Sequence, residues 1–515
     1  MNRTRPDAMS QKGIVSTSSL QASLAGVKII ERGGNVCDAA IATSAVLSVT
    51  QNNLCGLGGD GFALLRNDKG IVSINSSGKS SRNINAEIYE KKGLSKIPYQ
   101  GKLAAINVPG LVGLWIELYR NATMELGELL EPAIALAKNG FPVTHNYAKS
   151  IEVTLRHTKD KNFINTFSSS GNHPLVGDIF YQEDLAVMLN RLSEEGRDSF
   201  YRGNVADFLV KSFAKSDVVI DVQDMKGHKA LVDKPLSTEF EDRTIHELQP
   251  NSQGATVNFT LNVLKTMDDE KNSNWKMMKA MLIGNKFRNH FIGDPERLKL
   301  PNNFQSPDFV QRIAEMEESD DGKPGREGDT TYFTIALEDG SAISMIQSNY
   351  TGFGSTVVPE GTGFSLQNRG SYFSLDPNHH NFLEPNKRTF HTLCAGMIER
   401  GKEFEFSIGT MGGDIQPQIH ISMINNLILK AFTPQESIDL PRINFIGSIY
   451  EKPSQLIFED PELVTKEMLG IFKDYKFTGQ LSSSHGHCQI IKRNENGVLM
   501  GGADPRGDGF AIPIL

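Results

Sequence analysis

The stretch DTTYFTIALEDGSAISMIQSNY occupies residues 329–350 and predicts a β-hairpin. Residues 331–337 and 341–348 have the pattern of strands and flank Asp339-Gly340, the strongest short-range signal for a hairpin. Immediately before them lies MEESDDGKPGREGD, residues 316–329, whose charge, glycine and proline content cannot support a packed element. We therefore expect an exposed linker that ends at Asp329 and continues directly into a hairpin strand.

Outside this hairpin, the sequence alternates between helical and strand patterns. Helices are expected over 18–32, 38–48, 111–119, 126–138, 183–194, 416–431 and 462–475. Strands are expected over 403–407, 455–458 and 488–492, and over 61–75 about a turn at 67–70. Helices, then sheets, then helices indicate a layered α/β protein with stacked sheets inside.

Length and composition narrow the class of protein. A chain of 515 residues can bury a large core in one big domain or two intimate ones. Its net charge of −8, without any basic stripe, argues against nucleic acid as a partner. The longest mostly apolar stretch, 39–49, is about half of the ~20 residues that a spanning helix needs, so we expect a soluble protein without a membrane partner. The N-terminal MNRTRPDAMSQKG lacks the apolar run of a secretory signal, so we expect cytoplasmic residence.

The cysteines indicate neither a disulfide framework nor a metal site. They are scattered without CxxC spacing, as reduced structural thiols would be, at Cys37, Cys55, Cys394 and Cys488. His485, His487 and Cys488 lie close together in the sequence and could suggest a metal site. However, adjacent positions on a strand point to opposite faces, and there is no second cluster of candidate ligands. We therefore expect no metal and no cofactor.

Two glycine-rich elements stand out. Residues 56–61, GLGGDG, match the dinucleotide pattern GxGxxG, but a predicted helix precedes them and a strand follows, which is the reverse of what pyrophosphate binding needs. Residues 409–414, GTMGGD, lie between a strand and a helix, where backbone N–H groups can converge on an anion or a developing oxyanion. A simple packing turn explains the second element equally well on local grounds. The signatures of the common hydrolase and kinase sites are absent.

These elements belong to a set of stretches that resembles a known family. The stretches are GGNVCDAAIATSAVLSV (33–49), CGLGGDGF (55–62), NVPGLVGLW (107–115), LLEPAIALAKNGFPV (129–143), DTTYF (329–333), NYTGFGS (349–355), EPNKRTFHTL (384–393) and TMGGD (410–414). Together, in this order, they resemble the gamma-glutamyltransferase family, the glutathione hydrolase group of N-terminal nucleophile (Ntn) hydrolases. The resemblance implies a four-layer αββα sandwich with an additional helical region in the large subunit.

The resemblance also implies a maturation and a catalytic apparatus. The proenzyme would cut itself between Asp329 and Thr330, giving a large subunit of 1–329, with linker 316–329, and a small subunit of 330–515, intertwined in one catalytic domain. The freed Thr330 carries a nucleophilic hydroxyl and an α-amine whose pKa near ~8 lets it accept a proton near neutrality. By the same resemblance, backbone N–H groups of Gly412 and Gly413 would form the oxyanion hole, and Ser348 would orient the nucleophile.

Substrate recognition departs from the family pattern. The arginine that classical members place on the glutamyl α-carboxylate is missing from residues 75–79, NSSGK, where Ser77 lies nearest its position; Lys79 and Arg82 are the candidates to replace it. Where an acidic pair would hold the α-ammonium, this chain has Arg369 and Tyr372. The paired serines are replaced, and the segment 373–387 is too short for a lid, as in the lidless, cephalosporin-acylase-like branch. The substrate-binding candidates are Arg369, Tyr350, Tyr372, His391, Thr392 and Lys79.

The pattern supports one leading function and two alternatives. The first is transfer of a γ-glutamyl group from glutathione-like amides, through a threonyl ester, to water or an amine; without a lid, water should be the preferred acceptor. The second is an amidase for glutaryl-like acyl groups, which Arg369 favours. The third is a non-catalytic family member with a binding role, against which the retention of Thr330, Gly412 and Gly413 argues. The expected partners are a small-molecule amide and the two fragments of one precursor; the sequence leaves a homo-oligomer open.

We predict that the purified chain separates into fragments 1–329 and 330–515 on denaturing electrophoresis, because a linker precedes Thr330 and a hairpin strand follows it. N-terminal sequencing of the smaller fragment should give Thr-Thr-Tyr-Phe. Another N-terminus, or an intact chain that nevertheless has amidase activity, would show that the chain is not an N-terminal threonine hydrolase.

We also predict that Thr330→Ala leaves the fold intact but abolishes both self-cleavage and turnover. Thr330→Ser, which keeps a hydroxyl and an amine, should retain part of each activity. Turnover by Thr330→Ala after separate expression of the two fragments would contradict the role given to this hydroxyl.

Overall fold

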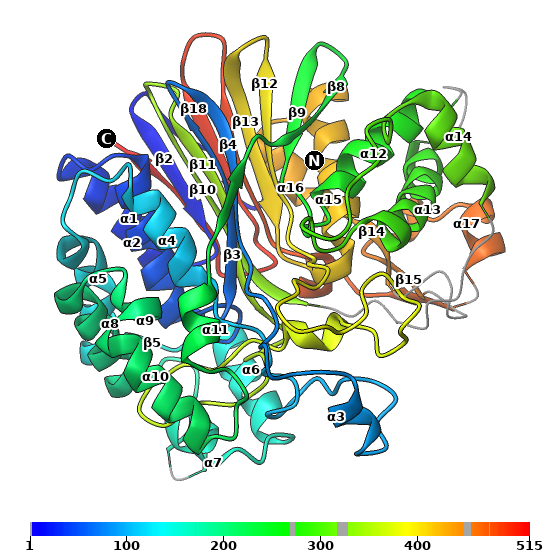
Figure 1. The fold of residues 1–515 in the computed structure, drawn as a ribbon. Helices are drawn as coiled ribbons and strands as arrows, with labels where there is room; N and C mark the ends of the chain where they lie inside the picture. The colour runs from blue at the N-terminus through cyan, green and yellow to red at the C-terminus, as the bar shows by residue number, and fades with distance from the viewer. Residues whose placement is uncertain (1–2, 170, 268–272, 317–327, 447–454, 473) are drawn as a thin grey trace.

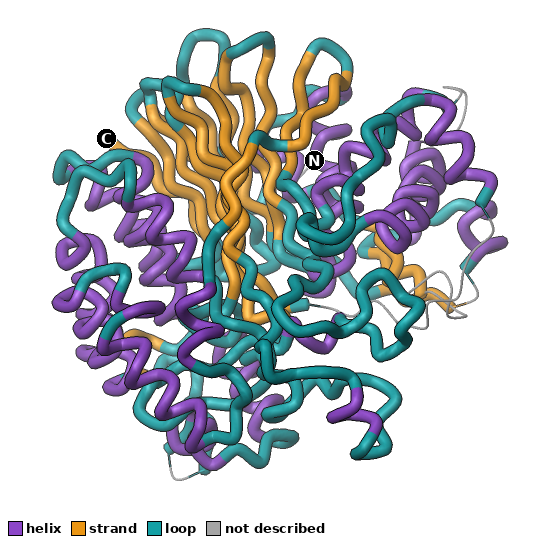
Figure 2. Tube along the Cα trace, viewed as in Figure 1, coloured by secondary structure: helices purple, strands orange, loops and turns teal. Residues whose placement is uncertain are grey.

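Two antiparallel sheets face each other in the centre of the molecule, and helices cover both outer faces (Figures 1 and 2). The computed structural model describes residues 3–515 except 170, 268–272, 317–327, 447–454 and 473. Within these residues each of the two sheets has seven strands. The four layers are thus helices, sheet, sheet and helices, which confirms the predicted αββα sandwich.

Strands from both ends of the chain make up each sheet. The first sheet has the order β1 (Ala8–Ser10), β18 (Leu499–Ala503), β17 (Cys488–Arg493), β13 (Glu403–Thr410), β12 (Ala395–Arg400), β9 (Arg243–Glu247), β8 (Leu236–Phe240). The second has the order β19 (Phe510–Ile514), β2 (Gly13–Thr17), β10 (Asp329–Leu337), β11 (Ala342–Tyr350), β3 (Asp60–Asn67), β4 (Gly70–Ser76), β7 (Leu231–Asp233). The predicted hairpin is therefore β10–β11, at the centre of the second sheet.

The two outer layers bury the outer faces of the sheets. The second sheet is covered by α1 (Leu20–Glu31), α2 (Val36–Thr50) and α4 (Leu111–Tyr119). The first is covered by α12 (Gly254–Lys265), α15 (Gln416–Ile424) and α16 (Pro434–Asp439), with α13 (Ser273–Phe291) packed on α12. Every residue of α2 is buried. Its alanines, serines and threonines leave room for close packing on all sides, which explains a helix without a polar face.

The additional helical region predicted for the N-terminal part is present beyond α2. There α5 (Leu126–Asn139) packs on α2, α8 (Glu183–Glu195) on α5, and α10 (Asn204–Lys215) on α8. The remaining helices are α3 (Glu87–Glu90), α6 (His145–Leu155), α7 (Lys161–Phe167), α9 (Ser199–Arg202), α11 (Val222–Gly227), α14 (Pro307–Glu315) and α17 (Lys466–Ile471). Two short strands, β5 (Phe141–Pro142) and β6 (Ile179–Phe180), pair between them.

Most sequence-based boundaries agree with the structure, but the helix predicted over 462–475 is wrong. Among the described residues of that range, only α17 is α-helical, and β16 (Asp474–Phe477) adds in parallel to β15 (Gln455–Phe458), which pairs with β14 (Ile443–Ile446). The Thr465 side chain caps the start of α17 by accepting a hydrogen bond from Met468 N–H, so the helix begins late. The helix predicted over 416–431 consists of α15 followed by a π-helical turn, Asn425–Leu429. Residues 317–327, most of the predicted linker, lie outside the described residues.

The two sheets meet closely at Gly409, on β13. A Cβ added there would lie 2.2 Å from a ring carbon of Tyr332, on β10 of the facing sheet. Tyr332 is buried, and its hydroxyl lies 2.7 Å from Ser344 Oγ on β11. The absence of a side chain at 409 thus lets β10 approach the opposite sheet.

We predict that Gly409→Ala lowers the free energy of unfolding by about 1–3 kcal/mol, because the added methyl group overpacks the space between the sheets. Urea unfolding followed by fluorescence would measure the change. Gly470→Ala is the matched control: position 470 is in α17 with open space around a Cβ, so alanine should be neutral or slightly stabilising. A Gly409→Ala variant as stable as the wild type would contradict the close contact.

Candidate active site

Thr330 lies at the start of β10, beside an irregularity in the β10–β11 ladder. Asp329 pairs with Tyr350 and Thr331 with Gln347, so two steps along β10 match three along β11. This shift brings Thr330 opposite Ser348, and Thr330 Oγ1 donates a hydrogen bond to Ser348 Oγ over 3.2 Å. Both side chains are buried.

The Ser348 hydroxyl connects the threonine to the peptide bond before it. Ser348 Oγ donates to the carbonyl oxygen of Asp329 at 2.8 Å and accepts from Tyr350 N–H at 2.8 Å. The hydroxyl of Thr330 and the carbonyl of the Asp329–Thr330 peptide therefore share one hydrogen-bonding partner. The structure thus brings together Asp329, Thr330 and Ser348, as the sequence predicted.

The second predicted glycine element lies against this peptide. Gly412 and Gly413 follow β13 with φ of 135° and 57°, conformations that favour glycine. A Cβ on Gly328 would lie 3.0 Å from Gly413 Cα and 3.4 Å from the Tyr350 ring. Residue 328 is therefore packed between the glycine turn and Tyr350.

A set of polar contacts fixes this turn through Asp414. Tyr372 O–H donates to Asp414 Oδ2 at 2.8 Å, and Arg288 Nη1 lies 3.3 Å from Asp414 Oδ1. Gln253 Nε2 donates to the carbonyl oxygen of Gly413 at 3.0 Å. Side chains from α13 and from the loop before α12 thus hold the turn from outside.

Arg369 is a buried cation next to the tyrosines of the site. Its Nη1 donates to Thr392 Oγ1 at 3.1 Å, and its guanidinium carbon lies 4.2 Å from the centre of the Tyr350 ring and 5.3 Å from that of Tyr372. Its Nε and Nη2 atoms have no hydrogen-bond partner among the described residues. Burial lowers the pKa of Arg369, an effect that Tyr372 and Tyr350 oppose. The stacking on aromatic rings offsets only part of the cost of a buried charge, and two N–H donors remain available.

His391 is turned toward Asp60, at the start of β3. The distance from His391 Nε2 to Asp60 Oδ2 is 3.2 Å, and both side chains are buried. Burial raises the pKa of Asp60 to about 7, although Gly78 N–H and Gln367 Nε2 both donate to its Oδ1. Burial, with Arg369 nearby, lowers the pKa of His391 well below its usual value. His391 is thus a neutral ring near pH 7, held by a carboxyl group that titrates close to neutrality.

Lys79 and Arg82 are engaged elsewhere in this structure. Lys79 Nζ lies 2.5 Å from Glu296 Oε2, which also accepts from Arg388 Nη1 at 2.7 Å. Arg82 Nε pairs with Asp221 Oδ2 at 2.9 Å and is half exposed. Both cations are therefore held by carboxylates, and no hydrogen bond or ion pair joins either of them to Thr330 within the described residues.

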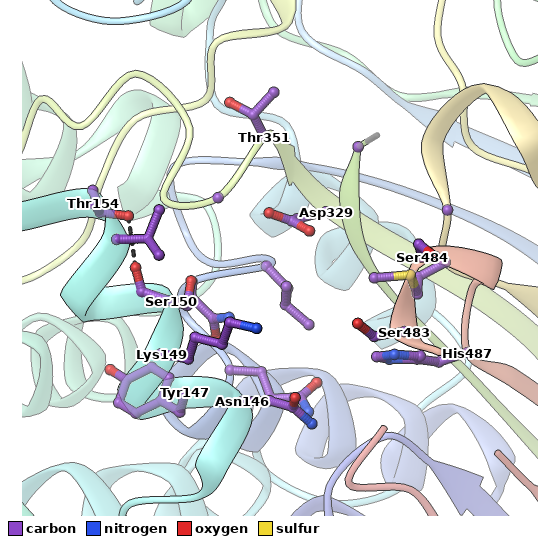
Figure 3. A pocket seen from close by; sticks show the side chains of 18 of the residues that line it. Asn146, Tyr147, Lys149, Ser150, Thr154, Asp329, Thr351, Ser483, Ser484 and His487 are labelled. Atoms are coloured by element: carbon purple, nitrogen blue, oxygen red, sulfur yellow. Dashed lines mark hydrogen bonds between the residues drawn. The ribbon is translucent and has the colours of Figure 1, made fainter. Parts of the chain in front are cut away.

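A cavity of about 840 Å³ adjoins the Asp329–Thr330 peptide. Its lining includes Gly328, Asp329, Met411 and Gly412 from the candidate site, together with residues of α6 and of the segment 483–487. Figure 3 shows the Asp329 side chain reaching into this space from one side, with Lys149 and His487 on facing walls. Arg369, Tyr372 and Thr392 do not line it.

In the described part of the chain, no group of three or more His, Cys, Asp or Glu side chains is arranged to hold a metal ion. None of the helices within those residues combines the length and the apolar character needed to cross a membrane.

The αββα layers, with a threonine at the start of a central inner strand, define the Ntn hydrolase class. The chain belongs to the Gamma-glutamyltranspeptidase family, whose model matches residues 22–514. It is 33% identical to the glutathione hydrolase-like YwrD proenzyme of Bacillus subtilis (98% of each chain covered) and 32% identical to the oxamate amidohydrolase proenzyme of Klebsiella pneumoniae (95% and 96%). The solved cephalosporin acylase from Bacillus halodurans matches with a TM-score of 0.91 at 30% identity, over 100% of this chain and 98% of that one. The protein is therefore an enzyme of this hydrolase family.

Several residues of the site were not identified from the sequence. Asp60 and Asp414 fall inside the glycine-rich stretches 55–62 and 410–414, so their position in those stretches was an available signal. Gln253 and Arg288 lie more than 120 residues from the turn they hold, in segments with no motif, so only the fold shows their role. The residues of α6 that line the cavity had no signal either.

We predict that Ser348→Ala slows self-cleavage by at least about tenfold, because it removes the hydrogen bond to the Asp329 carbonyl and the partner of the Thr330 hydroxyl. A time course of freshly translated precursor on denaturing gels would measure the rate. Ser344→Ala is the matched control, since Ser344 is a buried hydroxyl on the same strand that bonds Tyr332 instead. Equal cleavage rates for the wild type and Ser348→Ala would contradict this prediction.

Proposed function

We propose that this protein is a self-cleaving amidohydrolase in which Thr330 is the nucleophile, acting on amides whose acyl group carries a carboxylate. The observation that carries the proposal is Arg369, a buried guanidinium beside the site with two unpaired N–H donors. Such donors match the two oxygens of a carboxylate. The proposal has three parts: maturation, turnover and choice of acyl group.

In the proposed maturation, Thr330 Oγ attacks the carbonyl carbon of Asp329. Ser348 Oγ accepts the threonine proton and passes its own proton to the carbonyl oxygen, so the tetrahedral intermediate carries a neutral hydroxyl. When the C–N bond breaks, the amine takes the proton of that hydroxyl, and an ester joins Asp329 to Thr330 Oγ. Water then hydrolyses the ester, which releases the Asp329 carboxylate and leaves Thr330 with a free hydroxyl and α-amine.

The two fragments would stay together after this cut. The second sheet contains β2, β3, β4 and β7 from residues 1–329, together with β11, β19 and all of β10 after Asp329 from residues 330–515. Central β10 pairs with β2 on one side and with β11 on the other. This interleaving supports the proposal of two subunits that form one catalytic domain.

In the proposed turnover, the α-amine of Thr330 accepts the proton of its hydroxyl as the oxygen attacks the substrate carbonyl. Backbone N–H groups of Gly412 and Gly413 would stabilise the oxyanion, held in place by the contacts of Asp414 and Gln253. The amine product leaves with that proton, and water hydrolyses the threonyl ester. An amine that takes the place of water would give acyl transfer.

Arg369 also bears on which acyl group is accepted. Of the nearby carboxylates, Asp414 is held by Tyr372 and Arg288, and Asp60 by His391, Gly78 and Gln367. An α-ammonium on the acyl group would thus meet a buried cation and two engaged carboxylates. At short range in a partly dehydrated site, the repulsion between that ammonium and the Arg369 guanidinium costs on the order of a kcal/mol. A glutaryl-like acyl group, with a carboxylate and no ammonium, avoids it.

The second candidate is a γ-glutamyl group from glutathione-like amides. Membership of the Gamma-glutamyltranspeptidase family and the name of the glutathione hydrolase-like relative from Bacillus subtilis favour it. Against it, Lys79 and Arg82 are engaged by Glu296 and Asp221 and leave the missing arginine unreplaced. The third hypothesis, a non-catalytic binding protein, predicts no turnover of either substrate.

We predict that the wild type hydrolyses a glutaryl amide at least as well as the matching γ-glutamyl amide, by kcat/KM. Arg369→Gln should shift the ratio toward the γ-glutamyl amide, because it removes the cation that repels an ammonium. Arg369→Lys, which keeps the charge, is the matched control and should keep the wild-type preference.

A preference of tenfold or more for γ-glutamyl that Arg369→Gln leaves unchanged would show that Arg369 does not face the acyl group. Circular dichroism of both variants would show whether the fold survives the loss of the buried guanidinium.

A further inference from the structure

One face of α6 forms a wall of the cavity beside Thr330. Asn146, Lys149, Ser150 and Val153 follow helical spacing and all line this space. Asn146 Nδ2 donates to Asp508 Oδ1 at 3.0 Å, which ties the helix to the C-terminal part of the chain across the site. The opposite wall contains Ser483, Ser484 and His487 (Figure 3). The cavity is thus built by elements on both sides of the proposed cleavage point.

The stereochemistry of acyl transfer assigns a role to this space. A carbonyl carbon attacked by Thr330 carries the oxyanion, the acyl chain and the leaving amine, and these three groups diverge. Gly412, a proposed oxyanion donor, lines the cavity, whereas Arg369, the proposed acyl partner, does not. If the acyl chain extends toward Arg369, the amine extends into the cavity. Its volume of about 840 Å³ suits an amine much larger than ammonia.

The charges of the cavity point to the kind of amine. Lys149 is exposed, reaches into the space in Figure 3, and has no hydrogen bond or ion pair within the described residues. The carboxylates that line the cavity are Asp508, which accepts from Asn146, and Asp329. After the proposed cleavage Asp329 becomes a chain end and is no longer held by β10, whereas Lys149 stays on α6. The two histidines of the lining, His157 and His487, carry no negative charge.

We infer that this cavity binds the leaving amine of the substrate and that Lys149 selects amines that carry a carboxylate. This inference rests on the proposed function and adds to it the chemical class of the amine. Its test therefore needs one readout that depends on turnover and one that does not.

The first experiment compares two chromogenic amides with the same acyl group, a 4-nitroanilide and a 3-carboxy-4-nitroanilide. The wild type should favour the carboxylated amide by about fivefold in kcat/KM, as one partly exposed ion pair would give, with the effect in KM. Lys149→Gln should abolish that preference and Lys149→Glu should reverse it. Lys159→Gln is the matched control, an exposed lysine in the same region that does not line the cavity. The same ratio in the wild type and Lys149→Gln would overturn the inference and leave the proposed function intact.

The second experiment measures binding of the free amines, 5-amino-2-nitrobenzoate and 4-nitroaniline, by equilibrium dialysis against the purified wild type and both glutamine variants. The carboxylated amine should bind about fivefold more weakly to Lys149→Gln than to the wild type and Lys159→Gln, and 4-nitroaniline should bind all three equally. Equal binding of the carboxylated amine to all three would overturn the inference even if neither amide is hydrolysed. Failure of turnover with the predicted binding difference would instead count against the proposed function alone.

Discussion

The pairing of β10 with β11 is the constraint on which the rest of the site depends. Both strands are buried on both faces, so a shift of one residue would move every side chain to the wrong layer. The ladder therefore fixes Thr330 in space, and its irregularity at Asp329 and Thr331 brings the threonine hydroxyl and the preceding carbonyl to the same Ser348 oxygen. A flexible segment could not hold three oxygens in this arrangement without a large entropic cost.

The polar groups around this strand are organised by burial rather than by exposed charge pairs. Asp414 links Tyr372 and Arg288 to the glycine turn, while Asp60 holds His391. In a dehydrated environment each such contact restricts its partners strongly, and each unpaired donor is costly. Arg369 keeps two unpaired donors in that setting, so a carboxylate supplied by the substrate would stabilise it.

The glycine turn separates the cavity from the residues around Tyr372 and Asp414. The turn at Gly412 and Gly413 lies between the cavity, which it lines at Gly412, and the group of Tyr372 and Asp414 that holds it from the other side. The side chains on either side lie on loops and on α6 rather than in the sheets, so substitutions there need not disturb the sheet pairing. Membership of the family therefore establishes the hydrolase class, and the substrate depends on those side chains.

The sequence by itself determined the layered fold, the hairpin and the glycine turn, because strand patterns, Asp339-Gly340 and the order of motifs are local or collinear signals. It also indicated that Arg369 replaces an acidic group. It misassigned 462–475, where pairing of β16 with β15 outweighs a helical pattern. Only the tertiary structure decided that Lys79 is engaged by Glu296, that Arg288 and Gln253 hold the turn, and that α6 lines the cavity. Those contacts join residues far apart in the chain, and their geometry depends on packing that no local pattern encodes.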